Sequence, residues 1–472
     1  MSDIRATSGA ASQPTHRNAD PELRRDLGVW GAVAIVVGTV IGSGIFLVPK
    51  AMILRVGSPE MVFAVWIFGG ILTLFGALTY AELAAALPGA GGEYVYLREA
   101  YGPFWGFLYG WTQTWVAKSA SIATLATAFF YYLANFQPGL ESTLFSIPLP
   151  IGPNGGPLDI SYGQILSMAV ILGLGWLNYF GVRVGGGVQV GVTALKVLLI
   201  IGIVVIGLFS GRGQVGNFST TVSADGGFAG FFAALVAALW AYDGWNNVSM
   251  VASEVNKPQR NLPIALIGGT LLVIAIYMAT NLAYFYVLSA PQVAGSDRVA
   301  AVMMREILGP TGANMVSIAA MISIFAALNG AILSGSRVPY ALAKDGLFFS
   351  AYARVNERYR TPGVSLLLLS AWSAVLVMSG RYEQLYTLVI FPSWILYAMA
   401  AASVVVLRRK RPELERPYRT LGYPLVPVLF VLVACVLIVS TLLESPRESV
   451  LGLVIIAAGL PFYRHWKRRS LL

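Results

Sequence analysis

Two short segments place helix-breaking glycines and polar side chains inside long apolar runs. Gly42-Ser43-Gly44 lies within residues 28–50, and Asp243-Gly244 lies within residues 228–253. Glycine and serine weaken a helix, and a carboxylate in mid-membrane is costly unless it is used or paired. A small-residue packing face would also explain the glycines. A structural carboxylate satisfied by backbone groups or by a nearby lysine would also explain Asp243.

If both runs are helices broken at these points, each break exposes backbone groups that a continuous helix would pair. The N–H groups that follow Gly44, together with the Ser43 hydroxyl, suit a carboxylate. The carbonyl groups near residues 240–243, with those of Val40 and Ile41, suit an ammonium group. Donors and acceptors placed side by side in this way fit the zwitterion of an α-amino acid.

Two lysines lie within apolar runs. Lys196 is about ten residues into the run at 186–209, which puts it about 15 Å deep, too deep to reach the interface easily. Its ammonium can take the place of a bound cation and donate to carbonyls of the broken first helix; a wet cavity with no specific partner is the alternative. Lys118, midway along residues 103–135, either lines the pocket or pairs with Asp243. Arg337 is near enough to an inner helix end to reach the interface.

The composition excludes most functional classes. Apolar residues make up 57% of the 472 residues and charged residues 11%, whereas a soluble domain has about a quarter charged residues. The chain is therefore predicted to be an integral membrane protein, not a soluble enzyme, a nucleic-acid-binding protein or a disordered chain. The single cysteine is in an apolar run and both histidines are in polar tails, which argues against a metal site, a cofactor or catalytic machinery.

Twelve apolar runs are long enough to span a membrane. They are residues 28–50, 61–87, 103–135, 161–182, 186–209, 228–253, 262–289, 311–343, 363–380, 384–407, 424–443 and 449–463. With the N-terminus inside the cell, 22 of the 32 Lys and Arg residues lie in inner segments and 7 in outer segments. This bias predicts a cell-membrane protein with both termini in the cytoplasm. The basic run 408–419 is interpreted as an inner loop in contact with anionic lipid.

The broken runs are the first and the sixth, so each would begin one of two five-span halves. Breaks at matching positions in two halves are typical of transporters built from inverted repeats. The expected organisation is a cytoplasmic tail (1–27), a first repeat (28–209), a second repeat (210–407), a basic loop with two further spans (408–463) and a basic cytoplasmic tail (464–472).

Six segments resemble the amino acid permeases of the amino acid–polyamine–organocation (APC) superfamily, in particular the L-amino-acid transporter branch. They are VGTVIGSGIF (37–46), YAELAAALPGAGGEYVYLREAYGPFWGFLYGW (80–111), VQVGVTALKVL (188–198), LWAYDGWNNV (239–248), SEVNKPQRNLP (253–263) and LNGAILSGSRVPYALAKDGLF (328–348). The resemblance implies an all-α, LeuT-type fold of five plus five helices, with helices 1 and 6 unwound and two helices added.

The resemblance also implies roles for individual residues. Substrate contacts are expected from the first unwound segment (Val40, Ile41, Gly42, Ser43 and Gly44) and from the sixth helix (Trp240, Ala241, Tyr242, Asp243 and Asn246), with Trp240 gating the pocket from outside. Lys196 would stand in for a sodium ion, which implies sodium-independent transport, usually by obligate exchange. Lys118 and Asn329 are further candidates for the pocket lining.

The segment WAYDGWN is similar to b-zero-plus members of this branch, which accept neutral and dibasic amino acids. An acidic side chain can pair with a dibasic substrate, but Lys118 can neutralise it, so neutral L-amino acids are expected, with dibasic ones left open. Eukaryotic members pair with a heavy chain through a cysteine in the loop after span three, and loop 136–160 has none. A single chain without a disulfide-linked partner is therefore expected. Proton-coupled symport, a channel and a non-transporting sensor are the alternatives.

Overall fold

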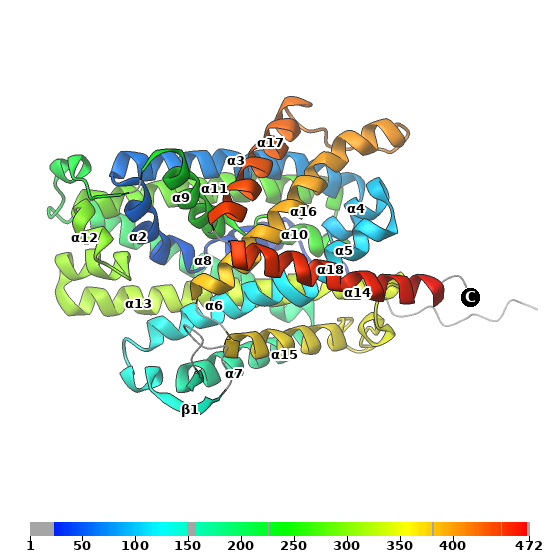
Figure 1. The fold of residues 1–472 in the computed structure, drawn as a ribbon, viewed down its shortest axis with the longest axis horizontal. Coiled ribbons are helices and arrows are strands. Elements are labelled where there is room, and N and C mark those ends of the chain that lie inside the picture. The colour runs from blue at the N-terminus through cyan, green and yellow to red at the C-terminus, as the bar shows by residue number, and fades with distance from the viewer. Residues whose placement is uncertain (1–22, 149–156, 225, 380–381, 445, 470–472) are drawn as a thin grey trace, which may run out of the picture.

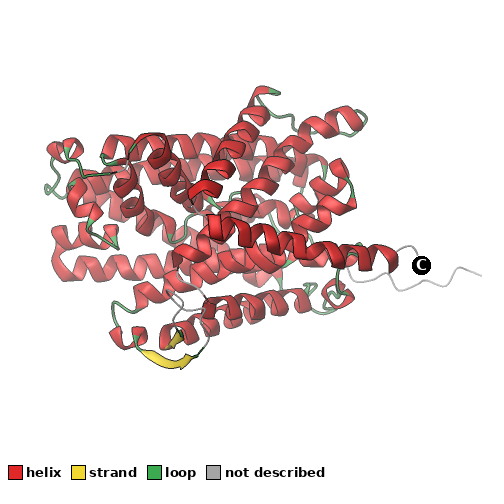
Figure 2. Cartoon of the chain, viewed as in Figure 1, coloured by secondary structure: helices red, strands yellow, loops and turns green. Residues whose placement is uncertain are grey.

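The computed structural model describes residues 23–148, 157–224, 226–379, 382–444 and 446–469. Figure 2 shows that this part of the chain is almost entirely helical, which confirms the all-α prediction. Most of the expected N-terminal tail (1–22) and the last residues of the C-terminal tail (470–472) lie outside the described residues.

The chain forms eighteen α-helices within the described residues, joined by short helical turns. The first half contains α1 (Val29–Val40), α2 (Gly44–Val56), α3 (Pro59–Ala86), α4 (Glu93–Tyr101), α5 (Pro103–Thr112), η1 (Gln113–Ala117), α6 (Lys118–Leu133), η2 (Pro138–Glu141), α7 (Tyr162–Tyr179) and α8 (Val182–Phe209). The second half contains η4 (Val215–Ser219), α9 (Gly227–Tyr242), α10 (Asn247–Met250), η5 (Ala252–Glu254), α11 (Pro258–Val287), α12 (Ala290–Ala294), α13 (Val299–Gly335), α14 (Arg337–Lys344), η6 (Ser350–Ala353), α15 (Gly363–Ser379) and α16 (Tyr382–Lys410). The last two helices are α17 (Leu425–Glu444) and α18 (Pro446–Arg469).

Eight helical segments of the described chain are long and apolar enough to cross a membrane, and two shorter apolar helices accompany them. Their outer faces carry large apolar side chains, for example Leu432 and Val439 on α17 and Val454 on α18, all exposed. A surface of this kind suits hydrocarbon, where a helix satisfies its own backbone groups. The chain is therefore a multi-pass membrane protein, as predicted.

Helices far apart in sequence pack side by side. In Figure 1, α3 lies along α11, α13 lies along α6, and α7 pairs with α15 at one edge. The last two helices, α17 and α18, pack mainly against α16. The result is a bundle whose centre contains the ends of α1, α2, α9 and α10.

Both predicted helix breaks are present. Helix α1 ends at Val40 and α2 begins at Gly44, while α9 ends at Tyr242 and α10 begins at Asn247. At the second break, Gly244 has a φ of 101°, a conformation that other residues adopt only with strain. After the second break, the regular helix α10 is only four residues long and is followed by the turn η5.

The structure also shows features that the sequence did not predict. The expected outer loop 136–160 contains a small antiparallel pair of strands, β1 (Thr143–Ile147) and β2 (Leu158–Ser161). The third apolar run contains a five-residue π-helix, η1, directly before Lys118. Helix α13 starts twelve residues before the predicted span at 311 and bends at Gly309, whose φ is 66°.

The prediction that Arg337 reaches the membrane interface is wrong. Its guanidinium is buried and forms two bonds to the carboxylate of Glu254, from Nε at 2.7 Å and from Nη2 at 3.1 Å. Nη1 also donates to the carbonyl of Leu333 at 2.6 Å. The Arg337 side chain does not extend to the interface, because Glu254 is a buried partner for its charge.

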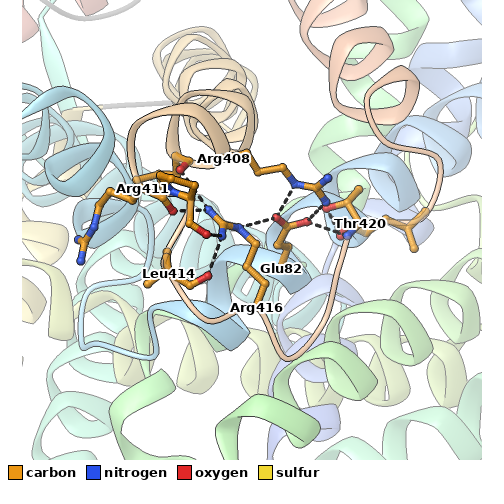
Figure 3. A network of polar contacts seen from close by, with 9 residues as sticks. Glu82, Arg408, Arg411, Leu414, Arg416 and Thr420 are labelled. Carbon is orange, nitrogen blue, oxygen red and sulfur yellow. Dashed lines mark hydrogen bonds and ion pairs between the residues drawn. The ribbon is translucent and has the colours of Figure 1, made fainter.

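The basic run 408–419 is folded against the bundle, and three of its arginines have partners within the protein, while its contact with anionic lipid stays a prediction. In Figure 3, the carboxylate of Glu82, at the end of α3, accepts bonds from Arg408 at 2.7 and 2.9 Å and from the Thr420 N–H at 2.7 Å. Arg416 donates to backbone carbonyls of the loop itself. Arg411 pairs with Glu99 of α4 at 2.8 Å.

Candidate binding site between the broken helices

A small cavity lies between the two helix breaks. Its free volume is about 20 Å³, so the site is nearly closed in this conformation. Its walls are Thr39, Val40, Gly42, Ser43, Gly44, Ser121, Leu125, Trp240, Asp243, Gly244, Asn247 and Ala331. Residues 39–44 come from the first break and residues 240–247 from the second, so two segments about 200 positions apart in sequence form one site.

Six of the ten predicted contact residues line this cavity: Val40, Gly42, Ser43, Gly44, Trp240 and Asp243. The other four face elsewhere. The carbonyls of Ile41 and Ala241 accept bonds from Lys196 and Tyr277, respectively. The hydroxyl of Tyr242 donates to Trp66, and the amide of Asn246 donates to Glu93.

The donor end of the cavity is the start of α2. Ser43 precedes this helix and does not cap it through its side chain, and the positive end of the helix dipole is directed at the break. Gly44 allows a close approach, because a Cβ there would lie 2.5 Å from the Cα of Ala241. The two broken helices therefore touch through backbone at this position.

The acceptor end is partly satisfied within the protein, which corrects the simple prediction of bare carbonyls. The Tyr277 hydroxyl is 2.9 Å from the carbonyl oxygen of Val40 and 2.8 Å from that of Ala241. The Thr39 hydroxyl lies 2.9 Å from the Gly244 carbonyl. Buried carbonyls need partners, but each oxygen has two lone pairs, so Val40 can accept a second bond.

Lys196 lies where the sequence predicted it, against carbonyls of the broken first helix. Its buried Nζ donates to Gly38 at 2.6 Å and also to Ile41, and the Ser323 carbonyl is 3.5 Å away. The Ser323 hydroxyl adds a second bond to the Ile41 carbonyl at 3.0 Å. One ammonium thus contacts carbonyl oxygens on both sides of the point where α1 ends.

Lys118 neither lines the cavity nor forms an ion pair with Asp243 within 4 Å. Its Nζ donates to Asn247 at 2.7 Å, and Asn247 does line the cavity. The Asp243 carboxylate instead accepts from the Tyr397 hydroxyl at 3.0 Å. Lys118 and Asp243 are nevertheless close enough for their charges to interact.

Asn329 lies outside the cavity lining. Its side chain accepts from Asn178 at 2.8 Å and donates to Gln189 at 3.0 Å. Ala331, two positions further along α13, lines the cavity instead. Two residues correspond to about 200° of helix rotation, so a motif match without the helix phase selected the wrong face.

Several site residues were missed. Ser121 and Leu125 line the cavity from α6 and follow Lys118 at spacings that share a helix face, so this signal was available. Tyr277 and Tyr397 contact the breaks from α11 and α16, and no local pattern identifies them.

The comparisons with known proteins agree with this geometry. The family model described as "Amino acid permease" matches residues 27–460. The serine/threonine exchanger SteT of Bacillus subtilis (strain 168) is 33% identical over 454 residues, which cover 96% of this chain and 99% of that protein. The chain belongs to the amino acid permease family.

Other relatives of this permease are eukaryotic. The b(0,+)-type amino acid transporter 1 of Mus musculus is 31% identical, over 93% of this chain and 88% of that protein. The cystine/glutamate transporter of Homo sapiens is 29% identical, over 94% and 85%. The L-amino-acid-transporter assignment within the superfamily is thereby confirmed, and the protein is an amino acid transporter, not an enzyme.

Proposed function

We propose that this permease is a sodium-independent exchanger of small neutral L-amino acids that works by alternating access. The observation that carries the proposal is the cavity enclosed by both helix breaks, with helix N–H groups at one end and carbonyl groups at the other. A zwitterion fits this arrangement, its carboxylate at Ser43 and Gly44 and its ammonium at the carbonyls of residues 40 and 240–242.

The polarity of the cavity favours a small substrate. In this closed conformation the free volume of about 20 Å³ admits about one water molecule, so the substrate would enter when the two breaks move apart. Thr39, Ser121 and Asn247 give the lining hydrogen-bonding groups, which suit a short hydroxylated or apolar side chain. The SteT relative is named as a serine/threonine exchanger. A small amino acid with a short side chain would be a similar substrate for this permease.

The proposed preference for neutral substrates rests on Asp243. Its carboxylate accepts a hydrogen bond from Tyr397 and lies within the field of Lys118. A carboxylate with these partners gains less from a cationic substrate side chain than an isolated one would. Dibasic amino acids are the second candidate class, because Asp243 lines the cavity and the name of one relative contains the b(0,+) system.

Sodium independence rests on Lys196. Its ammonium donates to Gly38 and Ile41, and a cation bound there would require the same carbonyl oxygens. Such an ammonium does not leave the protein, so no ion gradient is coupled through it. Exchange, in which one amino acid enters as another leaves, then needs no external ion.

The proposal includes the finer architecture. Twelve spans would form two inverted five-helix repeats (28–209 and 210–407), with residues 408–463 adding the basic loop and two helices. Both termini would lie in the cytoplasm of a cell-membrane protein, and the tails would be residues 1–27 and 464–472. The absence of cysteine from loop 136–160 supports function as a single chain without a disulfide-linked heavy chain.

Counterflow in proteoliposomes tests this function. Uptake of labelled serine or threonine is expected only when unlabelled amino acid is inside, and replacement of sodium by choline should leave the rate unchanged. Uptake into empty vesicles under an imposed pH gradient would favour proton symport instead. Ohmic single-channel currents would indicate a channel, and ligand-induced stabilisation without any uptake would indicate a sensor.

A further inference from the structure

Among the residues that the structure describes, no cationic side chain lies at hydrogen-bond distance from the carboxylate of Glu93, on the cytoplasmic side of the cavity. Glu93 begins α4, a nine-residue helix between two predicted spans, and its side chain is buried. One oxygen accepts from the Tyr109 hydroxyl at 2.9 Å, and the other accepts from the Asn246 amide. Asn246 belongs to the second helix break, so Glu93 connects α4 directly to the unwound segment.

The backbone around Glu93 is fastened to the inner half of the broken helix. Gly91 donates its N–H to the carbonyl of Met250 at 2.9 Å. A Cβ at Gly92 would lie 3.0 Å from the backbone of Ser249 and Met250, and both glycines have positive φ values. Because the segment just before α4 meets α10 through backbone, separation of the two elements would break this contact.

Two other buried acids in the described bundle differ from Glu93. Glu254 is paired with Arg337, and Glu82 with Arg408. An arginine partner is always charged and balances the charge of the carboxylate with which it pairs. The partners of Glu93 are a phenol and an amide, which bind the ion but do not neutralise it.

The charges around Glu93 do not balance when all groups are ionised. The titratable and charged groups that face it are Tyr96 on α4, Tyr80 on α3, Tyr109 on α5, Lys118 on α6, Tyr397 on α16 and, through Lys118, Asp243 at the break. This set holds one ammonium and two carboxylates. Burial raises the pKa of Glu93 to about 6, while the bonds from Asn246 and Tyr109 and the charge of Lys118 oppose the rise.

A cytoplasmic vestibule reaches the same element. A cavity of about 310 Å³ is lined by Gly89, Ala90, Tyr94, Val95 and Ser253, together with the charged side chains of Arg25, Arg98, Lys344 and Asp345. Residues 89–95 therefore separate this vestibule from the broken helix. When this segment moves, Glu93 becomes the first buried carboxylate of α4 to meet cytoplasmic water.

We propose that Glu93 is a protonation site that controls cytoplasmic opening of the permease through its bond to Asn246. With a proton on Glu93, the cluster is neutral and the contact between α4 and α10 is stable. Without the proton, an extra negative charge is buried, and the contact opens to hydrate it. The inference rests on the proposed transport function in one respect: cytoplasmic opening is taken to release the substrate.

The direction of the pH effect follows from linkage. Hydrated Glu93 in the open form has an ordinary pKa near 4.5, whereas in the closed form its pKa is about 6. Closed protein is therefore favoured at low pH and loses this advantage as pH rises from about 4.5 to 6. A difference of one pKa unit corresponds to a tenfold change in the equilibrium, so the open fraction should rise roughly tenfold or more across this window.

A cysteine at Ser249 measures opening without any substrate. Ser249 is fully buried against Gly92, so a maleimide can reach S249C only when α4 and α10 separate. The measurement uses the full chain in detergent with Cys435→Ser, because Cys435 is exposed. At each pH between 4.5 and 7.5, the labelling rate is divided by the rate of the same protein carrying E93Q. This ratio removes the pH dependence of the thiol reaction itself.

The expected ratio is near one at pH 4.5 and about tenfold higher at pH 7 and above. A ratio that stays constant across this range would overturn the proposal. If E93Q does not fold, Tyr109→Phe replaces it: loss of one donor to the ion should raise the pKa of Glu93 and move the labelling midpoint to higher pH. An unchanged midpoint in Y109F would also overturn the proposal. If the wild-type protein shows this labelling profile but no counterflow, the exchange proposal is refuted and the role of Glu93 is not.

Discussion

The two helix breaks border the same cavity but are held by different kinds of contact. The first break joins two regular helices of 12 and 13 residues. Its carbonyl groups are contacted by Lys196, Tyr277 and Ser323. The second break leads into a helix of only four residues. The polar side chains of this break form hydrogen bonds with neighbouring helices.

The side chains of the second break form polar pairs, in addition to the bonds that its Ala241 and Gly244 carbonyls accept from Tyr277 and Thr39. Asp243 accepts from Tyr397, Asn246 donates to Glu93, and Asn247 accepts from Lys118. Asn246 and Asn247 thus couple the break to groups that gain or lose protons or charge. The first break also meets one charged group, Lys196, but its own bonding atoms there are backbone carbonyls, so we expect the second break to be the part that substrate and pH adjust more.

The largest expected effect is at the point where the breaks touch. Gly44→Val places a branched side chain where even a Cβ would lie 2.5 Å from the Ala241 backbone. Overpacking of this kind costs about 1–3 kcal/mol, and the cavity loses its shape. Counterflow should fall at least about 100-fold, equivalent to roughly 2.7 kcal/mol, with a lower unfolding temperature.

Gly28→Ala is the matched control for that substitution. Gly28 precedes α1, and a Cβ there would meet nothing within 4 Å. It should keep near-wild-type counterflow. Normal transport by Gly44→Val would mean that the two broken helices do not approach as closely in the working protein as they do here.

Removal of the ammonium at the first break is expected to have the next largest effect. Lys196→Ala leaves the carbonyls of Gly38 and Ile41 without this donor, and each buried unsatisfied group costs about 1–3 kcal/mol. Exchange measured by counterflow should fall at least about tenfold, equivalent to roughly 1.4 kcal/mol, while expression changes little. Lys50→Ala, at an exposed ion pair with Asp297, is the control, and a wild-type rate in Lys196→Ala would contradict the cation-substitute role.

The sequence predicted the first break better than the second. Gly42, Gly44 and Lys196 were identifiable because each is unusual inside an apolar run, and backbone geometry follows directly from helix interruption. The contacts of Glu93 with Asn246, of Tyr277 with Val40 and of Tyr397 with Asp243 were not identifiable, since each joins positions far apart in sequence, and a tyrosine in a membrane helix is not unusual. Only the folded chain shows which tyrosine contacts a helix break.

Polar groups in the bundle were located with less success than the helix breaks. Arg337 and the arginines of 408–419 were assigned to the interface because sequence gives no partner for a charge, yet Glu254 and Glu82 supply one. The all-α membrane class followed from composition alone. Twelve spans, by contrast, stay a prediction, since eight helices of the described chain meet the length and hydropathy requirement.

A smaller, selective effect is expected from charge changes at the second break. Asp243→Asn should weaken uptake or binding of arginine more than that of serine, because a cationic side chain loses its carboxylate. Lys118→Gln should do the opposite and improve arginine relative to serine by about threefold to tenfold, since it removes the charge that neutralises Asp243. A panel of labelled amino acids in counterflow gives the ratio.

Glutamine at Lys118 keeps a hydrogen-bond donor for Asn247, so loss of folding is not the expected result. If Asp243→Asn reduced serine and arginine uptake equally, its carboxylate would have a structural role at the break. If Lys118→Gln left the arginine-to-serine ratio unchanged, electrostatic neutralisation of Asp243 would be ruled out as the source of the neutral preference.

The smallest expected effects come from the loss of two tyrosine hydroxyls. Their removal tests the contribution of each break separately. Tyr277→Phe removes the hydroxyl that lies between the Val40 and Ala241 carbonyls, and Tyr397→Phe removes the donor to Asp243. A hydrogen bond of this type contributes about 0.5–1.5 kcal/mol, so each variant should lose about two- to tenfold in counterflow. Tyr101→Phe, whose hydroxyl donates to Met399 outside the site, is the control.

The two tyrosine variants should differ in which substrates they affect. The Tyr277 hydroxyl contacts the backbone carbonyls of Val40 and Ala241, so its loss should weaken serine and arginine alike. Tyr397 holds the carboxylate of Asp243, so its loss frees that charge and should spare arginine while weakening serine. Equal losses for both substrates in both variants would mean that the second break is as rigid a frame as the first, and that substrate selectivity arises elsewhere in the cavity, for example at Ser121 or Leu125 on α6.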